Sequence, residues 1–260
     1  MVQSKSMLAS VNDEFGSSIM SCVAMRGSHS HGTYVPPEDN FGTDDIDLMC
    51  VTVPSVDHYL GLSVWGSRGT NEKWIGHLDV VAYEYKKFVS LLCNGNPNVI
   101  SMLWLRDCDY LYKDTTFNVL VKNRDLFSTG KVIGAFLGYA NAQMVHMEKA
   151  VFKGFMGEKR KALVTKFGFD TKHASHLIRL LRMLNEFLDT GRFNVWRHDA
   201  TNLVDIKCGR VAKDTVLTEA RELIFRAESH AMNLGNVPPC VDKTAVNAMI
   251  VNALRERFHV

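Results

Sequence analysis

An Asp-x-Asp pair at the start of an apolar run is the feature of this sequence that most restricts its fold. Asp45 and Asp47 lie just before residues 48–51 (Leu-Met-Cys-Val), a run typical of a buried strand. Residues two apart in a strand point to the same face, so the two carboxylates should converge on one point. Like charges repel each other there, and a divalent cation between them relieves the repulsion. The pair therefore predicts a Mg²⁺ site at the end of a strand.

A Gly-Ser pair upstream supplies a second element of such a site. The apolar run 19–25 predicts a strand that ends just before Gly27-Ser28, and Gly32 follows closely. A Gly-Ser turn that leads into a helix presents backbone N–H groups to a phosphate. A metal site next to a phosphate-binding turn indicates nucleotidyl transfer.

A third acid follows in the next predicted strand. Residues 74–83 predict that strand, and Asp79 stands between two apolar residues within it. Asp45, Asp47 and Asp79 together could hold two Mg²⁺ ions, with Mn²⁺ as an alternative, and Asp79 would belong to the ion that activates an attacking hydroxyl. The alternative is a surface hairpin with Asp79 facing water, because Asp-x-Asp is common by chance. The agreement of three separate elements favours the catalytic interpretation.

The composition excludes several classes of protein. With 260 residues, 46% of them hydrophobic, the chain can bury a core as one large domain or two modest ones. The formal net charge of +2 gives no reason for bulk affinity to nucleic acids or membranes. The six cysteines are scattered without a Cys-x-x-Cys pair, which argues against a zinc ribbon and indicates reduced thiols.

No targeting or membrane segment is expected. The N-terminus lacks an apolar segment of signal-peptide length, and no stretch reaches the roughly 18 apolar residues of a spanning helix. We therefore expect a soluble, cytoplasmic protein.

The secondary-structure signals change near residue 128. Before it, strands alternate with turns, and short helices are expected at 85–92 and from the Asn96-Pro97 turn through residues 100–105. After it, helical periodicity dominates, which divides the chain into an α/β part and an all-helical part. Long helices are expected near 131–150, 171–189, 214–232 and 242–257.

One of these helices carries a stripe of basic groups. At about 100° per residue, the leucines of 171–189 form an apolar face, and Lys172, His176 and Arg179 form a separate stripe beside it. Three potential cations in one line suit a triphosphate or a nucleic-acid backbone. An ordinary solvated basic face is the alternative, and periodicity alone favours it.

Two further basic features have more than one interpretation. His29 and His31 alternate in the Gly-Ser turn but lack the further ligands that zinc requires, so phosphate or substrate contacts are the better interpretation. The densest basic stretch, Lys153 to Lys166, is interleaved with phenylalanines and suits RNA through phosphate pairing and base stacking. A surface loop is the commoner explanation of such a stretch.

These residues resemble, in order, the signature of nucleotidyltransferases of the DNA polymerase beta superfamily, which is Gly-Ser, a later Gly, Asp-x-Asp and a third acid on a following strand. A narrower resemblance, to the RlaP-type predicted nucleotidyltransferases associated with RNA repair, spans most of the chain. The motifs that carry it are Gly27–Thr33 (GSHSHGT), Lys87-Phe88, Asn96-Pro97-Asn98, Gly138-Tyr139-Ala140 and Lys172–Leu180 (KHASHLIRL).

The resemblance implies an α+β fold. A polymerase-beta-like mixed sheet with helices, residues 1–128, would be the nucleotidyltransferase catalytic domain, and residues 129–260 would form an all-helical substrate-binding domain. The site residues it implies are Asp45, Asp47 and Asp79 for catalysis and metal binding, with Gly27, Ser28, His29, Lys172, His176 and Arg179 for nucleotide binding.

The implied activity is transfer of a nucleoside monophosphate from an NTP to an acceptor hydroxyl, with release of pyrophosphate. An RNA 3′ end of the tRNA type is the favoured acceptor. Two alternatives stay open: a non-catalytic nucleotide- or RNA-binding module, and a transferase of the toxin or antibiotic-modifying type that acts on a protein or small molecule. The sequence predicts neither the base used nor the oligomeric state.

Overall fold

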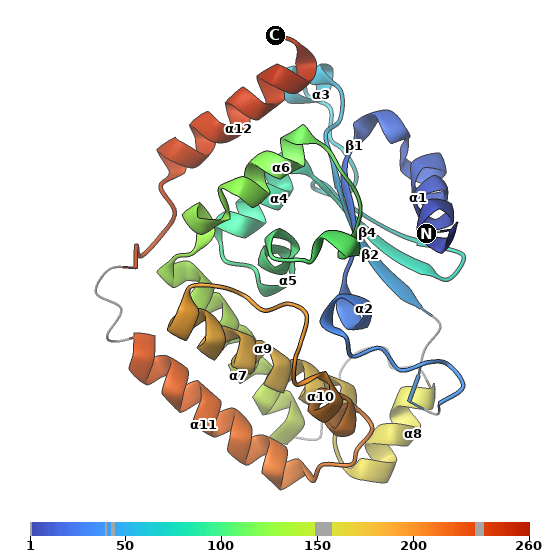
Figure 1. Ribbon diagram of the computed structural model, residues 1–260, viewed down its shortest axis with the longest axis vertical. Helices are drawn as coiled ribbons and strands as arrows, with labels where there is room; N and C mark the ends of the chain where they lie inside the picture. Colours follow the sequence, from blue (N-terminus) through green and yellow to red (C-terminus); the bar gives the residue numbers. More distant parts are fainter. Residues whose placement is uncertain (1, 40, 43–44, 149–157, 232–236) are drawn as a thin grey trace.

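Five strands form one mixed sheet in the first part of the chain (Figure 1). They are β1 (Met20–Met25), β2 (Ile46–Thr52), β3 (Thr70–Ile75), β4 (Leu78–Glu84) and β5 (Tyr110–Lys113). Their order across the sheet is β3-β4-β2-β1-β5, with β2 and β4 parallel and the other neighbours antiparallel. A helical part follows, which confirms the predicted α+β class.

This computed structural model describes residues 2–39, 41–42, 45–148, 158–231 and 237–260. The basic stretch from Lys153 to Lys166 lies partly outside these residues. The predicted helix ends at 149–150 and at 232 lie outside the described residues.

The single strand predicted over 74–83 is wrong, because the structure has a hairpin there. β3 and β4 are joined by the two-residue turn Gly76-His77. Gly76 has a φ of +61°, a left-handed conformation that tight hairpin turns require and that glycine adopts without strain. The hairpin places Trp74 opposite Asp79 on the neighbouring strand.

The helix expected from the Asn96-Pro97 turn through residues 100–105 starts as predicted but ends earlier. α5 spans Pro97–Ile100, and a 3₁₀ turn, η2 (Ser101–Leu103), replaces most of the rest of the expected helix. The Ser101 hydroxyl donates to the carbonyl oxygen of Pro97 at 2.9 Å, a side-chain bond that competes with the regular helical ladder.

The other elements of the first part are short. α4 (Tyr85–Cys93) confirms the helix expected at 85–92, whereas β5 and the helix after it were not predicted. The remaining elements are α1 (Val2–Phe15), η1 (Ser17–Ile19), α2 (Gly27–His31), α3 (Val56–Leu60), η3 (Asp107–Asp109), α6 (Thr115–Lys122) and η4 (Arg124–Phe127).

The helical part confirms the four long helices over the described residues. It contains α7 (Gly130–Glu148), α8 (Glu158–Phe167), α9 (Thr171–Thr190), α10 (Ala200–Lys207), α11 (Lys213–Ala231) and α12 (Lys243–Phe258). α8 corrects the expectation of a surface loop, because the start of this segment (Glu-Lys-Arg-Lys-Ala-Leu) consists of strong helix formers. α10 was not predicted.

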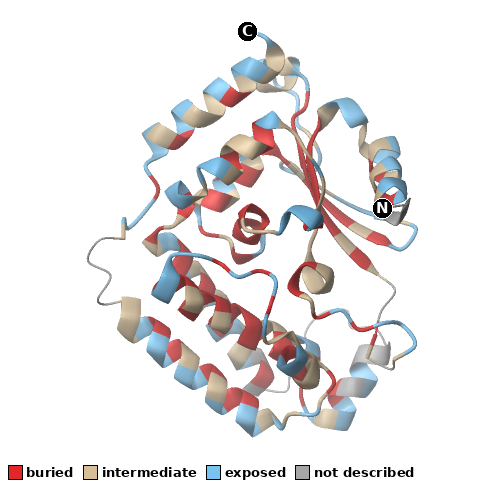
Figure 2. Cartoon of the chain, viewed as in Figure 1, coloured by how far each residue is buried: buried red, intermediate tan, exposed pale blue. Residues whose placement is uncertain are grey.

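The sheet has an apolar cluster on each face. Val23 and Leu48 pack toward α1 on one face, whereas Met49 and Val51 pack toward the helices α4, α6, α7 and α9 on the other. Side chains alternate along a strand, so Asp47 shares the face of Met49 and Val51. Buried residues follow the strands and run on into α9 (Figure 2).

The core on this face continues past residue 128, the predicted domain boundary. It joins Phe117 of α6 to Phe136 of α7. α12 also returns to the first part, where Arg257 forms an ion pair with Asp114 at the start of α6. The hydrophobic core does not divide at residue 128. The division into a catalytic domain (1–128) and a substrate-binding domain (129–260) therefore stays a prediction about function.

No described helix is long and apolar enough to cross a membrane. The six cysteines are free, and Cys22, Cys50 and Cys208 are buried. In these positions they pack as small apolar side chains.

Candidate active site

A cavity of about 460 Å³ lies where the sheet meets the helical part. β2, β4, α2 and α5 contribute lining residues from the first part of the chain, and α9 and α10 contribute them from the helical part. Small-ligand sites typically have volumes of about 300–1,000 Å³. Every predicted site residue except His29 lines this cavity, namely Gly27, Ser28, Asp45, Asp47, Asp79, Lys172, His176 and Arg179.

A row of four side chains crosses the sheet at the edge of the cavity. Trp74 on β3 pairs with Asp79 on β4, and Asp79 pairs with Asp47 on β2. Beyond Asp47, the backbone N–H of Arg26, next to β1, donates to the Asp47 carbonyl oxygen at 2.9 Å. Paired residues of neighbouring strands point to the same face, and all four line the cavity.

The Arg26 guanidinium contacts both acids of this row. Its Nη2 donates to Asp79 Oδ2 at 3.1 Å and lies 3.6 Å from Asp47 Oδ1. Burial raises the pKa of Asp47, and the positive charge of Arg26 acts in the opposite sense by favouring the ionised carboxylate. Asp47 and Asp79 therefore share one cationic partner.

These carboxylates suit Mg²⁺, which proteins usually hold through one or two carboxylates and the phosphates of a substrate. Asp47 and Asp79 each direct an oxygen toward the same guanidinium nitrogen, and Asp45 lines the same cavity. The expected convergence of three acids is not seen: within the described parts of the chain, no three Asp, Glu, His or Cys side chains form a group that could hold a metal ion. A two-ion site built by all three acids stays a prediction.

Close packing explains the two glycines of the turn after β1. Gly27 has a φ of +62°, and a Cβ atom there would lie 2.1 Å from Asp47 Oδ2. Gly32 has a φ of +72°, and its Cβ would lie 3.1 Å from the ring of Trp196. Both positions require glycine for conformational and steric reasons. The Gly-Ser turn is therefore in direct contact with an acid of the row.

The wall opposite the acids is basic. Arg179 of α9 is buried, and its guanidinium donates to Met183 Sδ at 3.2 Å and to His176 Nδ1 at 3.1 Å. Across the described residues, no carboxylate forms an ion pair with it. Burial lowers the pKa of Arg179 to about 9, so the group keeps its charge at neutral pH. This burial excludes a solvated basic face as the explanation for Arg179.

Two lysines line the same cavity. Lys172 belongs to the predicted stripe, whereas Lys207 at the end of α10 was not predicted because no periodic pattern marks it. Lys207 Nζ donates to the carbonyl oxygen of Thr33 at 3.4 Å. Burial, followed by the charge of Lys172, lowers the pKa of Lys207. The positive charges of Lys172 and Lys207 repel each other, and an anion bound in the cavity would relieve this repulsion.

His176, which lines this cavity, is a neutral side chain. Burial and the charge of Arg179 lower its pKa well below 6.5. Because Arg179 can only donate, Nδ1 of His176 accepts, and the proton of the neutral ring must be on Nε2. Nε2 is buried without a hydrogen-bond partner. The predicted stripe thus contains two cations and one neutral donor.

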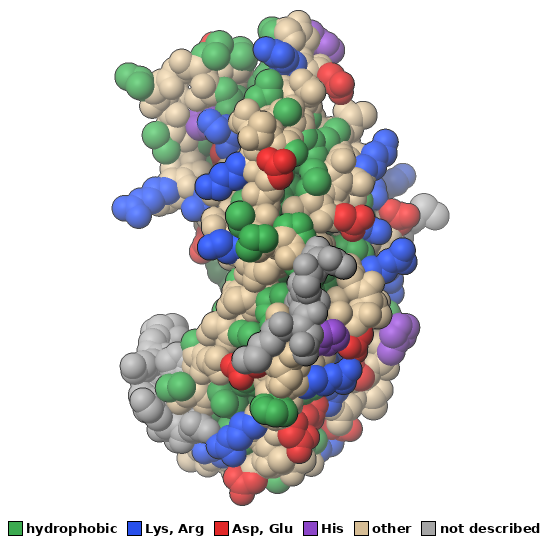
Figure 3. Space-filling model, turned by 90° about the vertical axis from the view of Figure 1, so that its left-hand side faces the viewer, with side chains coloured by type: hydrophobic (Ala, Val, Ile, Leu, Met, Phe, Trp, Pro, Cys, Tyr) green, Lys and Arg blue, Asp and Glu red, His purple; other side chains and the backbone are tan. Residues whose placement is uncertain are grey.

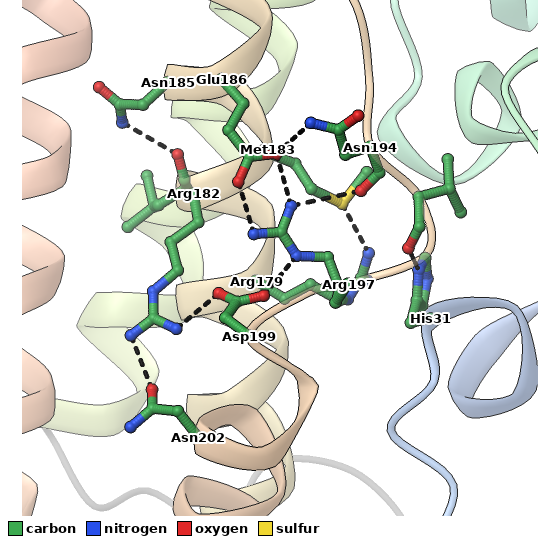
Figure 4. A network of polar contacts seen from close by, with 12 residues as sticks. His31, Arg179, Arg182, Met183, Asn185, Glu186, Asn194, Arg197, Asp199 and Asn202 are labelled. Carbon is green, nitrogen blue, oxygen red and sulfur yellow. Dashed lines mark hydrogen bonds and ion pairs between the residues drawn. The ribbon is translucent and has the colours of Figure 1, made fainter.

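A network of charged side chains fixes the segment between α9 and α10 (Figure 4). The Arg197 side chain is 3% exposed and binds Glu186 at 2.7 Å and Asp199 at 2.8 Å. The Arg197 backbone N–H donates to the carbonyl oxygen of His31 at 3.2 Å, and His31 Nδ1 donates to that of Val195 at 3.0 Å. These bonds tie α2 to the helical part and keep the Gly-Ser turn facing the basic wall.

We expect acid to weaken the fold through His31 and His176. Burial lowers the pKa of both well below 6.5, so below that pH the unfolded chain binds protons that the folded chain rejects. The free energy of unfolding should therefore be unaffected above about pH 6.5 and fall below it, by up to about 1.4 kcal/mol per pH unit for each histidine. Urea unfolding at about pH 7.5 and pH 5.5 measures this loss.

The control for this prediction is a set of histidine variants. His31→Asn and His176→Gln should each flatten the pH dependence, whereas the exposed His198→Asn should leave it unchanged. An unchanged slope in a His31→Asn/His176→Gln double variant would contradict the prediction.

His29 is the predicted site residue that does not line the cavity. Its ring lies against Tyr34, with 4.2 Å between the ring centroids. Burial lowers the pKa of His29, although Asp47 acts in the opposite sense. His29 is therefore placed to support the turn, and a direct contact with nucleotide stays a prediction.

One face of the outer surface does not repeat this concentration of positive charge. On that face, shown in Figure 3, basic and acidic side chains are interspersed. This agrees with the net charge of +2.

A Gly-Ser turn after the first strand, acids on two adjacent parallel strands and a helical wall across the cavity are the features of a nucleotidyltransferase of the polymerase beta type. Residues 4–224 match the model of the RlaP family, described as the RNA repair pathway DNA polymerase beta family. The chain belongs to this family, and membership implies transfer of a nucleoside monophosphate.

Comparison with individual proteins adds one structure. The crystal structure of a nucleotidyltransferase-like protein from Exiguobacterium sibiricum 255-15 matches over 98% of this chain and 78% of its own, with 12% sequence identity and a TM-score of 0.31. No curated protein matches the chain.

Proposed function

We propose that this protein is a Mg²⁺-dependent nucleotidyltransferase that transfers a nucleoside monophosphate from an NTP to the hydroxyl of an RNA 3′ end. The observation that carries the proposal is the opposition of two charged walls across one cavity, with Asp47 and Asp79 on the sheet and Lys172 and Arg179 on α9. An NTP with its metal presents cationic and anionic surfaces together, so it complements both walls. The choice of RNA rests on the family, whose description names RNA repair.

The basic wall would bind the triphosphate. Arg179 is buried and without a carboxylate partner among the described residues, and the buried Nε2 atom of His176 has no hydrogen-bond partner there. Charge-assisted bonds to phosphate are strong in such a partly dry site. Gly27 and Ser28 would contact the β and γ phosphates from the sheet side. On α9, Lys172 would add a positive charge beside Arg179 and His176.

The acids would hold the metal, with Mg²⁺ preferred and Mn²⁺ as an alternative. When bound, it would neutralise charge on the triphosphate and lower the pKa of the acceptor hydroxyl. Asp45 and Asp47 would bind the metal, and Asp79 would help to activate the acceptor hydroxyl by accepting its proton. The acceptor oxygen forms a bond to the α phosphorus, the bond from that phosphorus to its bridging oxygen breaks, and pyrophosphate leaves with the electron pair.

The nucleotide base would lie against the third wall, formed by α5 and η2. Asn98, Ser101, Met102 and Leu105 line the cavity there and combine polar and apolar groups. Such a mixture is typical of sites that orient a base by packing and a few hydrogen bonds. This wall would decide which NTP is used.

An acceptor screen tests the proposed function. The protein is incubated with each α-labelled NTP, Mg²⁺ or Mn²⁺, and separate RNA, protein and metabolite fractions. Label on RNA 3′ ends and release of pyrophosphate support the proposal, whereas label on protein or on a small molecule would redirect it to another acceptor. Metal-dependent NTP binding with no transfer to any fraction would contradict the enzyme assignment and favour a binding module.

We expect Arg26→Gln to tighten metal binding by the free protein. The guanidinium contacts both Asp47 and Asp79, so it competes with a cation for the same oxygens. Removing a positive charge at this distance should strengthen Mn²⁺ binding by at least about fivefold, or roughly 1 kcal/mol. Electron paramagnetic resonance of free Mn²⁺ at about pH 8 measures the affinity.

Arg192→Gln is the matched control, because Arg192 is exposed and does not line the cavity. It should leave Mn²⁺ affinity unchanged. Weaker binding in Arg26→Gln would show instead that Arg26 is needed to hold the carboxylates in position.

A further inference from the structure

Trp74 is an exposed tryptophan beside an acid of the candidate active site. It lies on the edge strand β3, is 62% exposed and lines the cavity. Its register partner across the hairpin is Asp79. Opposite residues in an antiparallel pair have Cβ atoms about 4.5–5.5 Å apart, so a group bound at Asp79 would lie next to the indole ring.

The position of Trp74 in the row separates it from the phosphate-binding side. The row runs Arg26, Asp47, Asp79, Trp74, and the Gly-Ser turn contacts Asp47 from the Arg26 end. Trp74 is at the opposite end, beyond the acid that the proposed function assigns to the acceptor hydroxyl. The wall of α5 and η2 is already the place for the base of the NTP.

Trp74 is the one tryptophan, tyrosine or phenylalanine among the described residues that line the cavity. Leu60, Leu62 and Val64 are also strongly exposed, but they precede the start of β3, whereas Trp74 is near its end. Trp74 thus presents a flat aromatic surface at the edge of a charged cavity, as in proteins that stack single-stranded bases.

We propose that Trp74 stacks on the terminal base of the acceptor RNA strand and so places its 3′ hydroxyl at Asp79. This inference rests on the proposed function and extends it by naming the residue that recognises the acceptor. Stacking is sequence-tolerant, because every base has a flat aromatic face. Trp74 therefore selects for an acceptor that carries a base rather than for a particular base.

The test compares Trp74→Ala and Trp74→Phe with the unchanged protein on two synthetic RNA oligonucleotides. One ends in a normal nucleotide, and the other has the same sequence with an abasic 3′-terminal ribose. Binding is followed by fluorescence anisotropy, and transfer by label incorporation at varied NTP and RNA concentrations. Tyr112→Ala is the matched control, because Tyr112 is an exposed aromatic residue on β5, the other edge of the same sheet.

We expect Trp74→Ala to bind the normal RNA about 5- to 150-fold more weakly, Trp74→Phe to retain most of the affinity, and Tyr112→Ala to match the unchanged protein. On the abasic RNA, the unchanged protein and Trp74→Ala should bind equally. The KM for the RNA should rise in Trp74→Ala while the KM for NTP does not.

Equal binding of the normal RNA by Trp74→Ala and the unchanged protein would overturn the inference, and so would a loss confined to the KM for NTP. The binding arm also separates this inference from the proposed function. If the unchanged protein transfers no nucleotide, the proposed function fails, but a base-dependent loss of RNA affinity in Trp74→Ala would still support stacking at Trp74.

Discussion

Asp47→Asn is expected to lower nucleotidyl transfer by at least about 10³-fold. The substitution removes one of the two carboxylates, Asp47 and Asp79, that are proposed to hold the metal ion. The change is nearly isosteric, and Asp47 is a group whose burial already raises its pKa. The fold should therefore tolerate the neutral amide. Incorporation of labelled nucleotide, Mn²⁺ binding and thermal unfolding are measured on the same preparation.

Asp107→Asn is the control for this variant. Asp107 carries a carboxylate of the same kind, but its side chain is 96% exposed and pairs with Lys113 away from the cavity. It should transfer nucleotide at the normal rate. If Asp47→Asn retained transfer within about tenfold of the unchanged protein, the assigned role of the acid row would be wrong.

Arg179→Met is expected to change stability and substrate binding in opposite directions. Among the described residues, the hydrogen-bond partners of the buried guanidinium are one sulfur and one imidazole nitrogen, so an apolar side chain of similar length should raise the free energy of unfolding by about 1–4 kcal/mol. The same change removes a positive charge from the basic wall, which is proposed to bind the triphosphate. NTP affinity should therefore fall by at least about tenfold. Urea unfolding and NTP titration measure the two effects.

Arg182→Met on the same helix is the matched control with the opposite sign. Arg182 is paired with Asp199 and Glu219 and does not line the cavity. Its loss should destabilise the protein by about 1.5–3 kcal/mol and leave NTP affinity unchanged. If Arg179→Met were the less stable of the two and still bound NTP normally, Arg179 would be a structural residue.

The sequence predicted the parts of the site that depend on local spacing. Gly27-Ser28 and Asp47 belong to short motifs whose geometry follows from one turn and one strand, and the structure places them in contact. Asp79 was found because an acid in an apolar strand is conspicuous. The family resemblance then linked motifs that the chain separates by many residues.

The parts that were missed depend on tertiary structure. The Gly76-His77 turn was not predicted, because apolar residues typical of a strand lie on both sides of it. Lys207 reaches the cavity only because α10 packs on α9, and no pattern in its own segment marks it. The burial of Arg179 was not predicted either, since periodicity gives the face of a residue but not what packs over it.

The path of the chain has a consequence for how the molecule can be assembled. It starts with α1 and the strands of the sheet, passes through the helical part and comes back with α12, where Arg257 donates to the carbonyl oxygens of Ser18 and Met20. Neither section is complete without residues distant in the sequence. Circularly permuted versions would therefore have to preserve this return, and a shortened chain that ends before α12 would leave the entry to β1 uncovered.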